Sequence, residues 1–273
     1  MKRIIFTIIA VLYVIYIIYW AWWFFISGNN ISFVFNFFAK IGNAKLKPNG
    51  EYDTSKASGL GKGGAVIARG GGLVDFLFFL LILTLTFIIE RAINVQQARG
   101  KMSFVKFFKE LNELVKARKI DEAIELANRQ GGAFGRLAKH GLERYKYIPQ
   151  KDDMQRVKEE LQEAFAEQSA IEGALLERRL IAIATIASIS TMTGLLGTVI
   201  GMIRCFAALS AKGRPDPNAL AVGISEALVN TAGGLLAAII SIIFYNFFVN
   251  KVDLFNFQME EITADVIEEL VRR

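Results

Sequence analysis

The chain has 273 residues, of which 53% are hydrophobic and 21% charged, and it carries a net charge of +6 with one histidine and one cysteine. This composition excludes an internal disulfide and a metal centre built from cysteines or histidines. The basic residues are spread out among Glu and Asp, so the charge does not predict a nucleic-acid interface. It suits a membrane protein whose basic loops face anionic lipid. No nucleophile–base pair or ligand cluster is visible, so we expect no enzyme activity, no catalytic or metal site and no cofactor.

The first apolar run, residues 4–26, contains no charged side chain. About 20 apolar residues cross the hydrocarbon core of a bilayer, so this run is long enough to span it. The two basic residues before it resemble the start of a signal peptide, but the run is longer than the apolar part of such a peptide. Its tryptophans are typical of an interfacial aromatic belt. We therefore predict that residues 1–27 form a retained N-terminal membrane anchor.

A polar, extracytoplasmic connector is predicted over residues 28–71. Its end is rich in glycine, which raises the question of a phosphate-binding loop. Such a loop needs Gly-Lys followed by Ser or Thr, whereas Lys62 is followed by Gly63 and no strand precedes it. A flexible linker is the simpler interpretation.

A second membrane span is predicted over residues 72–92. Its uncharged stretch of 14 residues lies between Asp75 and Glu90, and a run of that length is marginal for a span. The glycine-rich residues before it can extend the helix. Asp75 and Glu90 would then lie near the two membrane interfaces.

Residues 93–179 form the largest polar region, and we expect it to be helical. Apolar residues spaced three and four apart run through residues 104–127 and resume after Pro149, with a break at Gly131-Gly132. No further proline occurs before the next apolar run. We therefore expect one long helix to leave this region and continue into the third span, and we expect no strand.

Two further spans are predicted within residues 180–250, joined by a short outer turn. The region before them holds 18 Lys and Arg in residues 91–179, against 6 in residues 27–71. Because basic residues are enriched in cytoplasmic loops, residues 93–179 are expected to be cytoplasmic. Four spans then place both termini in the cytoplasm, with residues 251–273 as a C-terminal helix.

Polar and small residues are concentrated in these last two spans. Glycines and hydroxyl residues allow helices in a membrane to approach closely, and close packing alone would explain them. Glu226 needs a further explanation, because an ionisable group near the hydrocarbon usually faces a protein interior or a watery path. The alternative is an interfacial position at a helix N-terminus, where a negative charge is favoured. Arg204 is either its counter-charge or a side chain that reaches outward to the interface.

Two stretches of these spans resemble the MotA/TolQ/ExbB proton channel family. The first, residues 194–203, reads GLLGTVIGMI, and the second, residues 223–234, reads GISEALVNTAGG. Residues 206–209 and 242–246 resemble the ExbB-like branch. The resemblance extends from about residue 73 to the C-terminus, and the first apolar run lies outside it as an added anchor. The family often has a proline within the last span, which is absent here, so we expect a straighter helix.

The resemblance implies an all-α integral membrane protein of the bacterial inner membrane. Its long transmembrane helices would continue into a cytoplasmic helical bundle, and the chain would assemble as a cyclic homo-oligomer, commonly a pentamer. The ring would surround the single membrane helices of an ExbD-like partner, whose aspartate binds the proton. A TonB-like protein would carry the force to the outer membrane. The pore-lining positions carried over by motif are Thr198, Glu226 and Thr231, with Thr191, Arg204 and Asn230 as additional pore or packing residues.

Several functions remain open on the sequence alone. The leading hypothesis is an ExbB-like subunit that energises TonB-dependent transport. A TolQ-like subunit, or a motor subunit for gliding or secretion, would keep the mechanism and change the client. A non-conducting membrane scaffold is the alternative from another class, and a charge at Glu226 argues against it.

Overall fold

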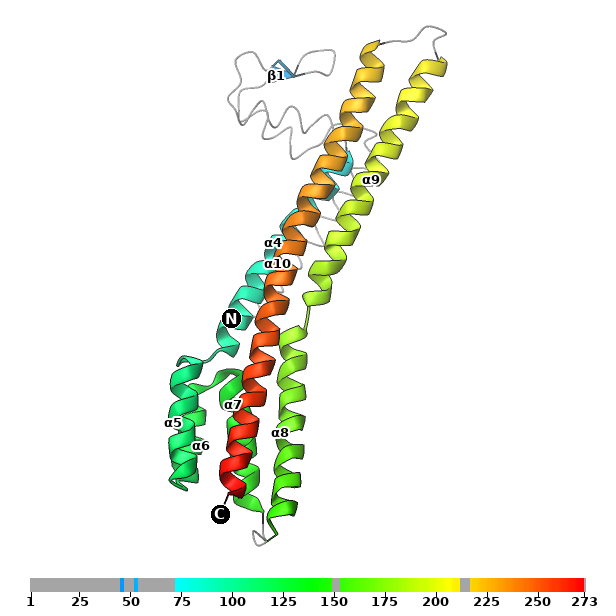
Figure 1. The fold of residues 1–273 in the computed structure, drawn as a ribbon. Coiled ribbons are helices and arrows are strands. Elements are labelled where there is room, and N and C mark those ends of the chain that lie inside the picture. Colours follow the sequence, from blue (N-terminus) through cyan, green and yellow to red (C-terminus); the bar gives the residue numbers. More distant parts are fainter. Residues whose placement is uncertain (1–44, 47–51, 54–71, 149–152, 212–216, 273) are drawn as a thin grey trace. The chain divides into compact units, whose positions relative to one another are not determined.

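The computed structural model describes residues 45–46, 52–53, 72–148, 153–211 and 217–272. Apart from one short strand pairing, this part of the chain is helical, which confirms the expectation of an all-helical protein (Figure 1). The chain divides into two compact units. The first contains residues 1–82 and 188–238, and the second contains residues 83–187 and 239–273. Three long helices contribute to both units: α4 (Gly72–Ala98), α9 (Leu180–Ala211) and α10 (Pro217–Val271).

The strand pairing lies in the connector before α4. β1 (Lys45–Leu46) pairs antiparallel with β2 (Tyr52–Asp53), so that Lys45 is opposite Asp53 and Leu46 is opposite Tyr52. No strand is expected there from the sequence. Two residues on each side are too few to show the alternating pattern by which a strand is recognised.

Three helical stretches of the described chain are long and apolar enough to cross a membrane. They are α4, the stretch Met154–Ala207 and the stretch Leu220–Val271. These stretches include the second, third and fourth predicted spans and have the length and apolar composition that a span needs. The predicted N-terminal anchor, residues 1–27, lies outside the described residues, as does most of the connector.

The polar region forms four helices: α5 (Phe104–Lys116), α6 (Ile120–Gln130), α7 (Gly132–Tyr147) and α8 (Met154–Glu177). Each packs on the next in chain order. The predicted break at Gly131-Gly132 is confirmed, and both glycines have positive φ angles, of 61° and 65°. Residues with a side chain rarely adopt this conformation, so glycine is what permits the tight turn from α6 to α7.

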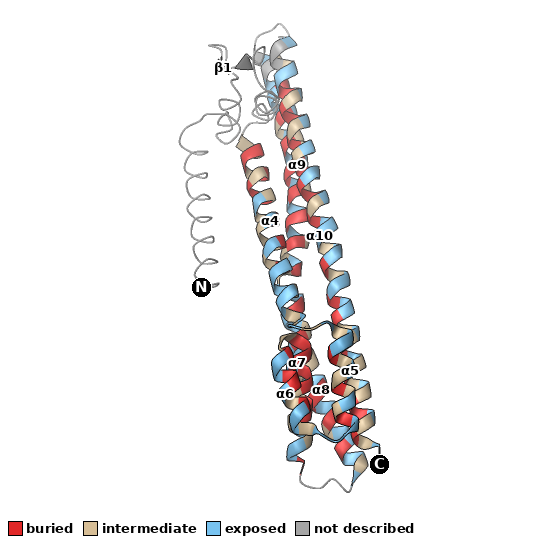
Figure 2. Cartoon of the chain, turned by 90° about the vertical axis from the view of Figure 1, so that its left-hand side faces the viewer, coloured by how far each residue is buried: buried red, intermediate tan, exposed pale blue. Residues whose placement is uncertain are grey.

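The second unit is held together by one apolar core. Figure 2 shows its buried residues as stripes along the helices, as expected for helices with one apolar face. The ring of Phe134 on α7 stacks on Phe255 of α10, with centroids 5.1 Å apart, and also contacts Phe104 of α5 at 5.2 Å. Burying an aromatic side chain of this size stabilises the fold by about 1.5–3 kcal/mol. The core therefore fixes the last part of α10 against the four helices.

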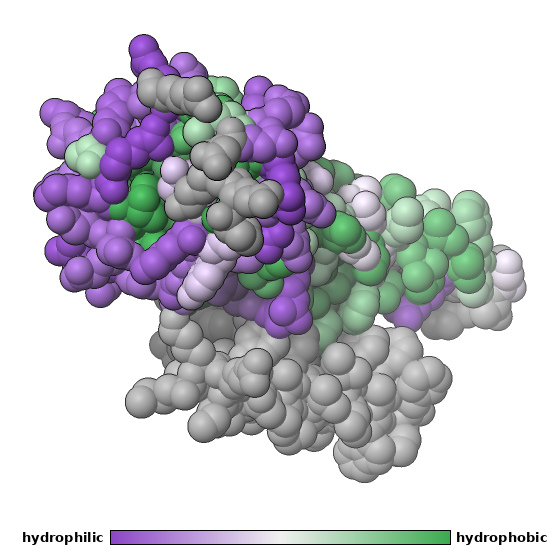
Figure 3. All heavy atoms as spheres, turned by 90° about the horizontal axis from the view of Figure 1, so that it is seen from below, coloured by the Kyte–Doolittle hydropathy of each residue, from purple (hydrophilic) through white to green (hydrophobic). Residues whose placement is uncertain are grey.

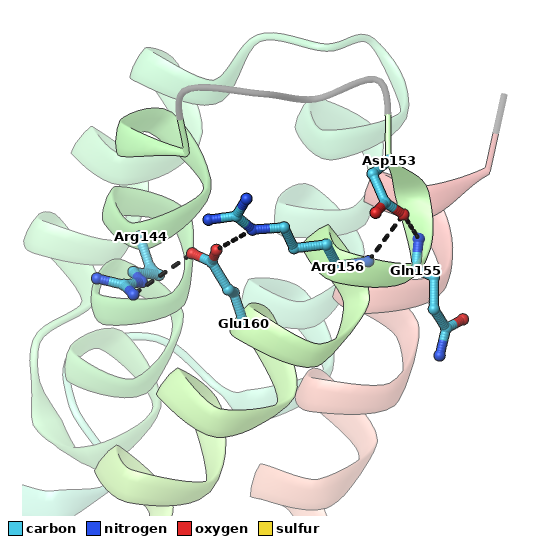
Figure 4. Close-up of polar contacts among 5 residues, drawn as sticks. All are labelled: Arg144, Asp153, Gln155, Arg156 and Glu160. Carbon is cyan, nitrogen blue, oxygen red and sulfur yellow. Dashed lines mark hydrogen bonds and ion pairs between the residues drawn. The ribbon is translucent and has the colours of Figure 1, made fainter.

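The outer surface of this unit is polar, in contrast to its core. Viewed from the end that carries α5 to α8, most of its residues are hydrophilic (Figure 3). Charged side chains also connect α7 to α8. Figure 4 shows Glu160 of α8 between Arg144 of α7 and Arg156, at 3.4 and 3.1 Å. At the start of α8, the Asp153 carboxylate accepts hydrogen bonds from the backbone N–H groups of Gln155 and Arg156, which caps the helix.

A second ion pair between α7 and α8 has a buried carboxylate and a half-exposed guanidinium. Nε and Nη2 of Arg136 donate to the two carboxylate oxygens of Glu172, at 2.6 and 2.5 Å. The Glu172 side chain is 2% exposed and the Arg136 side chain 52%. Hydrogen bonding to Glu172 raises the pKa of Arg136 above its usual value, although burial opposes this. The guanidinium therefore stays charged, and the buried carboxylate keeps its partner.

The expected single helix from the polar region into the third span is wrong in one place. α8 ends at Glu177 and α9 begins at Leu180, because Arg179 adopts a positive φ of 71°. The break has its own contacts. Arg91 of α4 donates to the carbonyls of Leu176 and Arg178, the latter at 3.0 Å, and Arg179 forms an ion pair with Glu90. Arg91 thus satisfies carbonyl groups that the end of a helix leaves without partners.

The last helix, by contrast, is unbroken. α10 runs for 55 residues from Pro217 to Val271, so the fourth span and the predicted C-terminal helix are one element. The absence of a proline within the span fits this continuity, since proline is the usual cause of a sharp kink.

We predict that Gly141→Ala destabilises the second unit, whereas Gly173→Ala does not. A β-carbon on Gly141 would overlap the ring of Phe165, and overpacking of a core costs about 1–3 kcal/mol. A β-carbon on Gly173 would lie 3.6 Å from Oδ1 of Asn256, an ordinary contact. Alanine should therefore stabilise α8 by up to about 1 kcal/mol there. Thermal unfolding of each variant in mild detergent, followed by circular dichroism, measures the difference. Equal unfolding temperatures for the two variants would show that the Gly141–Phe165 contact is not tight.

Candidate functional site

The first unit contains a seam of small residues between α9 and α10. On α9 they recur at Gly194, Gly197, Gly201 and Cys205, and on α10 at Gly223, Ala227, Asn230 and Gly234. Gly194 lies against Gly234, Gly197 against Asn230, Gly201 against Ala227, and Cys205 against Gly223. Positions that rise along α9 meet positions that fall along α10, so the two helices are antiparallel.

Along this seam the two backbones approach too closely to admit larger side chains. A β-carbon on Gly234 would lie 2.6 Å from the carbonyl oxygen of Ser190, and one on Gly201 would lie 2.9 Å from Cβ of Ala227. A β-carbon on Gly197 would overlap the side chain of Asn230. Without bulky side chains, helices in a membrane gain from van der Waals contact over a long interface. The seam thus fixes the register of α9 on α10.

Glu226 and Arg204 meet across the two helices. Nη1 of Arg204 donates to Oε1 of Glu226, and the pair joins the C-terminal part of α9 to the N-terminal part of α10. The Glu226 side chain is 11% exposed and the Arg204 side chain 41%. The two explanations left open for Arg204 are therefore decided in favour of a counter-charge. A buried carboxylate is tolerated where a cation and hydrogen bonds compensate for the lost water.

Asn230 and Thr231 also take part in the contact between the helices. The Asn230 side chain is fully buried and donates to the carbonyl oxygen of Glu226, one turn earlier on α10, at 3.0 Å. The Thr231 hydroxyl donates to the carbonyl oxygen of Gly194 on α9, at 3.3 Å. In each case a backbone carbonyl accepts a hydrogen bond from the polar side chain. Both residues therefore support the seam, whatever further role they have.

Thr198 and Thr191 are half-buried on α9. The Thr198 hydroxyl donates to the carbonyl oxygen of Leu195 in its own helix, at 2.6 Å, rather than to Glu226 or Thr231. Its oxygen keeps lone pairs that can accept a hydrogen bond from outside the chain. Of the six candidate residues, the structure thus joins Glu226, Arg204 and Asn230 directly, and attaches Thr231 to the same seam.

Thr84 and Ser241 were not predicted from the sequence as polar residues of interest, and Asp75 was predicted only as an interfacial residue. In the second unit, the hydroxyls of Thr84 on α4 and Ser241 on α10 lie 2.9 Å apart and both residues are fully buried. Asp75, expected near a membrane interface, is 1% exposed in the first turn of α4. The signal available for all three was a polar residue inside or beside an apolar run, which costs free energy unless it is satisfied.

Comparison with known proteins agrees with the geometry of these helices. Residues 130–261 match the model of the MotA/TolQ/ExbB proton channel family, a range that includes the whole seam. The chain is 27% identical to the biopolymer transport protein ExbB of Pseudomonas putida over 186 residues, which is 68% of this chain and 55% of that protein. It is 47% identical to ExbB of Aquifex aeolicus over 77 residues, or 28% of this chain and 52% of that protein.

A third relative comes from another branch. The chain is 46% identical over 71 residues to the Tol-Pal system protein TolQ of Haemophilus influenzae, which is 26% of this chain and 31% of that protein. The chain spans about half the length of the ExbB proteins that it matches. Three helices able to span a membrane, together with these relatives, make it a multi-pass membrane protein. Residues 130–261 of the chain thus match the MotA/TolQ/ExbB proton channel family, and the similarity to ExbB proteins supports its ExbB-like branch.

Proposed function

We propose that this protein is an ExbB-like inner-membrane subunit of a proton-driven motor that energises TonB-dependent transport at the outer membrane. The observation that carries the proposal is the ion pair of Glu226 with Arg204, held beside a glycine seam in two apolar helices. Charged groups at such positions are costly and mark ion pathways in membrane proteins. A non-conducting scaffold needs the seam but not the ion pair.

In this proposal the chain forms a homopentameric ring with α9 and α10 towards the axis. Large apolar side chains on the outer faces of these helices are exposed in the single chain: Met192, Leu195, Val199, Ile203, Leu228, Leu235 and Ile239. An isolated soluble protein rarely exposes so much apolar surface. Lipid, neighbouring subunits and the partner's helix would cover it. Both termini and helices α5 to α8 would lie in the cytoplasm, with residues 1–27 as an added anchor.

The proton itself would be carried by an aspartate on an ExbD-like single-span partner. Glu226 is paired with Arg204, so in this proposal the ion pair supplies a fixed local electric field, and proton carriage is left to the partner's aspartate. Thr198 and Thr231 would offer hydroxyl oxygens to water or to the partner's carboxylate. Thr191 and Asn230 complete this polar surface. The partner would transmit the work to a TonB-like protein.

A TolQ-like role is the second candidate, because the Tol-Pal system protein TolQ of Haemophilus influenzae matches at 46% identity over 71 residues. The two roles share the mechanism and differ in the client. Gliding and secretion motors would use the same subunit architecture with yet other clients.

The function is tested first by the partner it requires. The full chain, purified in mild detergent from its native membrane, should bring with it a small protein with one membrane span and an aspartate in that span. Mass analysis of the complex should give about five copies of this chain. Recovery of a homogeneous monomer without any single-span protein would contradict the motor proposal, and recovery of a Tol-type partner would assign the client instead.

We predict that Thr198→Val and Thr231→Val each lower proton-gradient-dependent activity at unchanged protein levels. Valine keeps the shape and removes the hydroxyl, and one lost hydrogen bond is worth about 1 kcal/mol, or about fivefold in rate if it acts in the rate-limiting step. Thr198→Ser and Thr231→Ser keep the hydroxyl and serve as controls, with activity close to that of the parent. Activity is measured as gradient-dependent uptake by cells that carry the variant. Full activity in both valine variants would leave the hydroxyls with a packing role only.

We further predict that Gly197→Ala disrupts the seam and that Gly233→Ala does not. The new methyl group at position 197 would overlap Asn230, at a cost of about 1–3 kcal/mol. At position 233 it would lie 3.5 Å from Cδ1 of Leu77, an ordinary contact. The yield of assembled complex on size-exclusion chromatography should therefore fall for Gly197→Ala alone. An unchanged yield for Gly197→Ala would show that α9 and α10 do not depend on this close approach.

A further inference from the structure

A cavity of about 360 Å³ lies in the second unit beside the break between α8 and α9. It is bordered by the last turns of α4, by α7 and by the break itself. Six charged residues line it: Arg91, Arg136, Arg178, Arg179, Glu90 and Glu172. Four guanidinium groups against two carboxylates leave the lining with an excess of two positive charges.

Most of these charged groups already have partners within the chain. Arg136 and Glu172 form a bidentate ion pair with two hydrogen bonds, and Arg179 forms an ion pair with Glu90. Arg91 donates to two backbone carbonyls. Arg178 differs from the other three arginines. Its backbone accepts from Arg91, but no carboxylate among the described residues pairs with its exposed side chain. The cavity thus offers one guanidinium and a net positive field to an outside anion.

The cavity lies at a definite depth along the helices. The uncharged run of α4 ends at Glu90, and the uncharged run of α9 begins at Leu180, directly after Arg179. The ion pair between Glu90 and Arg179 places these two ends at the same level. The ends of transmembrane apolar runs coincide with the headgroup layer of the bilayer. The cavity therefore opens where lipid phosphates are found.

Apolar side chains beside the cavity suit a lipid in particular. Leu175 lines the cavity and is 51% exposed. Ile89, which precedes Glu90, and Ile181, two residues after Arg179, do not line it but are 60% and 78% exposed. A free phosphate ion would leave this apolar surface exposed to water, whereas acyl chains would bury it. Arginine binds phosphate oxygens in a planar, two-pronged geometry, and basic pockets between membrane helices on the cytoplasmic side bind anionic headgroups.

We propose that this cavity binds the phosphate headgroup of an anionic phospholipid, with Arg178 as the residue that contacts it and the acyl chains lying along Leu175, Ile89 and Ile181. The bound lipid would compensate the excess charge around the α8–α9 break and hold it in one conformation. The site is separate from the seam of α9 and α10, and it does not depend on the identity of the motor's client.

The test is lipid binding to the full chain purified in a neutral detergent. Equal amounts of phosphatidylglycerol and phosphatidylcholine are added, and the lipid retained is identified by native mass spectrometry. We expect preferential retention of phosphatidylglycerol by the parent protein. Arg178→Gln should weaken that retention about fivefold, the loss expected for one basic residue at an anionic lipid surface. Arg178→Lys should keep most of it.

Arg129→Gln is the matched control, because Arg129 lies on α6 in an exposed ion pair with Glu125 and does not line the cavity. It should bind phosphatidylglycerol as the parent does. Inorganic phosphate at the same concentration should not displace the lipid. The proposal is overturned if the parent protein shows no preference for the anionic lipid, if Arg129→Gln loses it as much as Arg178→Gln, or if inorganic phosphate replaces it. The parent's preference is measured without any variant, so the test stands even if Arg178→Gln fails to fold.

Discussion

The close approach of α9 and α10 is the constraint on which the candidate site depends. Two antiparallel backbones meet through Gly194, Gly197, Gly201 and Gly234, so that carbonyl groups of one helix come within reach of side chains on the other. Thr231 can donate to Gly194 only because no side chain separates them. The same register brings Arg204 to Glu226. In a membrane there is no hydrophobic driving force between helices, and contact of this kind replaces it.

Buried charged side chains are compensated in the same way in both units. Three buried ionised side chains among the described residues have either a partner of opposite charge or backbone carbonyl groups that accept from them. Glu226 has Arg204, Glu172 has Arg136, and Arg91 has the carbonyls at the end of α8. Such pairs contribute little net stability compared with an apolar core, but breaking one leaves a buried charge that is very costly. These charge pairs therefore specify which helices pack together, and they add little to the free energy of unfolding.

The two long membrane helices differ in a way that matters for transmission of movement. α10 is continuous over 55 residues and reaches from the seam of the first unit into the core of the second. The path from α8 to α9 is interrupted at Arg178 and Arg179, where side chains of α4 supply the contacts. A continuous helix transmits rotation and displacement along its axis, whereas a break allows its two parts to move separately. In the motor that we propose, these elements would have different roles.

The sequence alone determined which stretches are long and apolar enough for a span, the helical character of the polar region, the break at Gly131-Gly132 and the family resemblance. Each of these depends on a local pattern: apolar run length, three- and four-residue spacing, a glycine pair and two motifs. It also named Glu226, Thr231 and Asn230 as important. Their partners, however, follow from the packing of the helices and not from any local pattern. Whether Arg204 turns inward or outward depends on which side chain stands opposite it, and that is set by the register of α9 on α10. The end of α8 at Glu177 could not be predicted from the sequence, because it too depends on contacts with a distant part of the chain. Neither proline nor glycine marks it, and the contacts that stabilise it come from Glu90 and Arg91, more than 80 residues earlier in the chain.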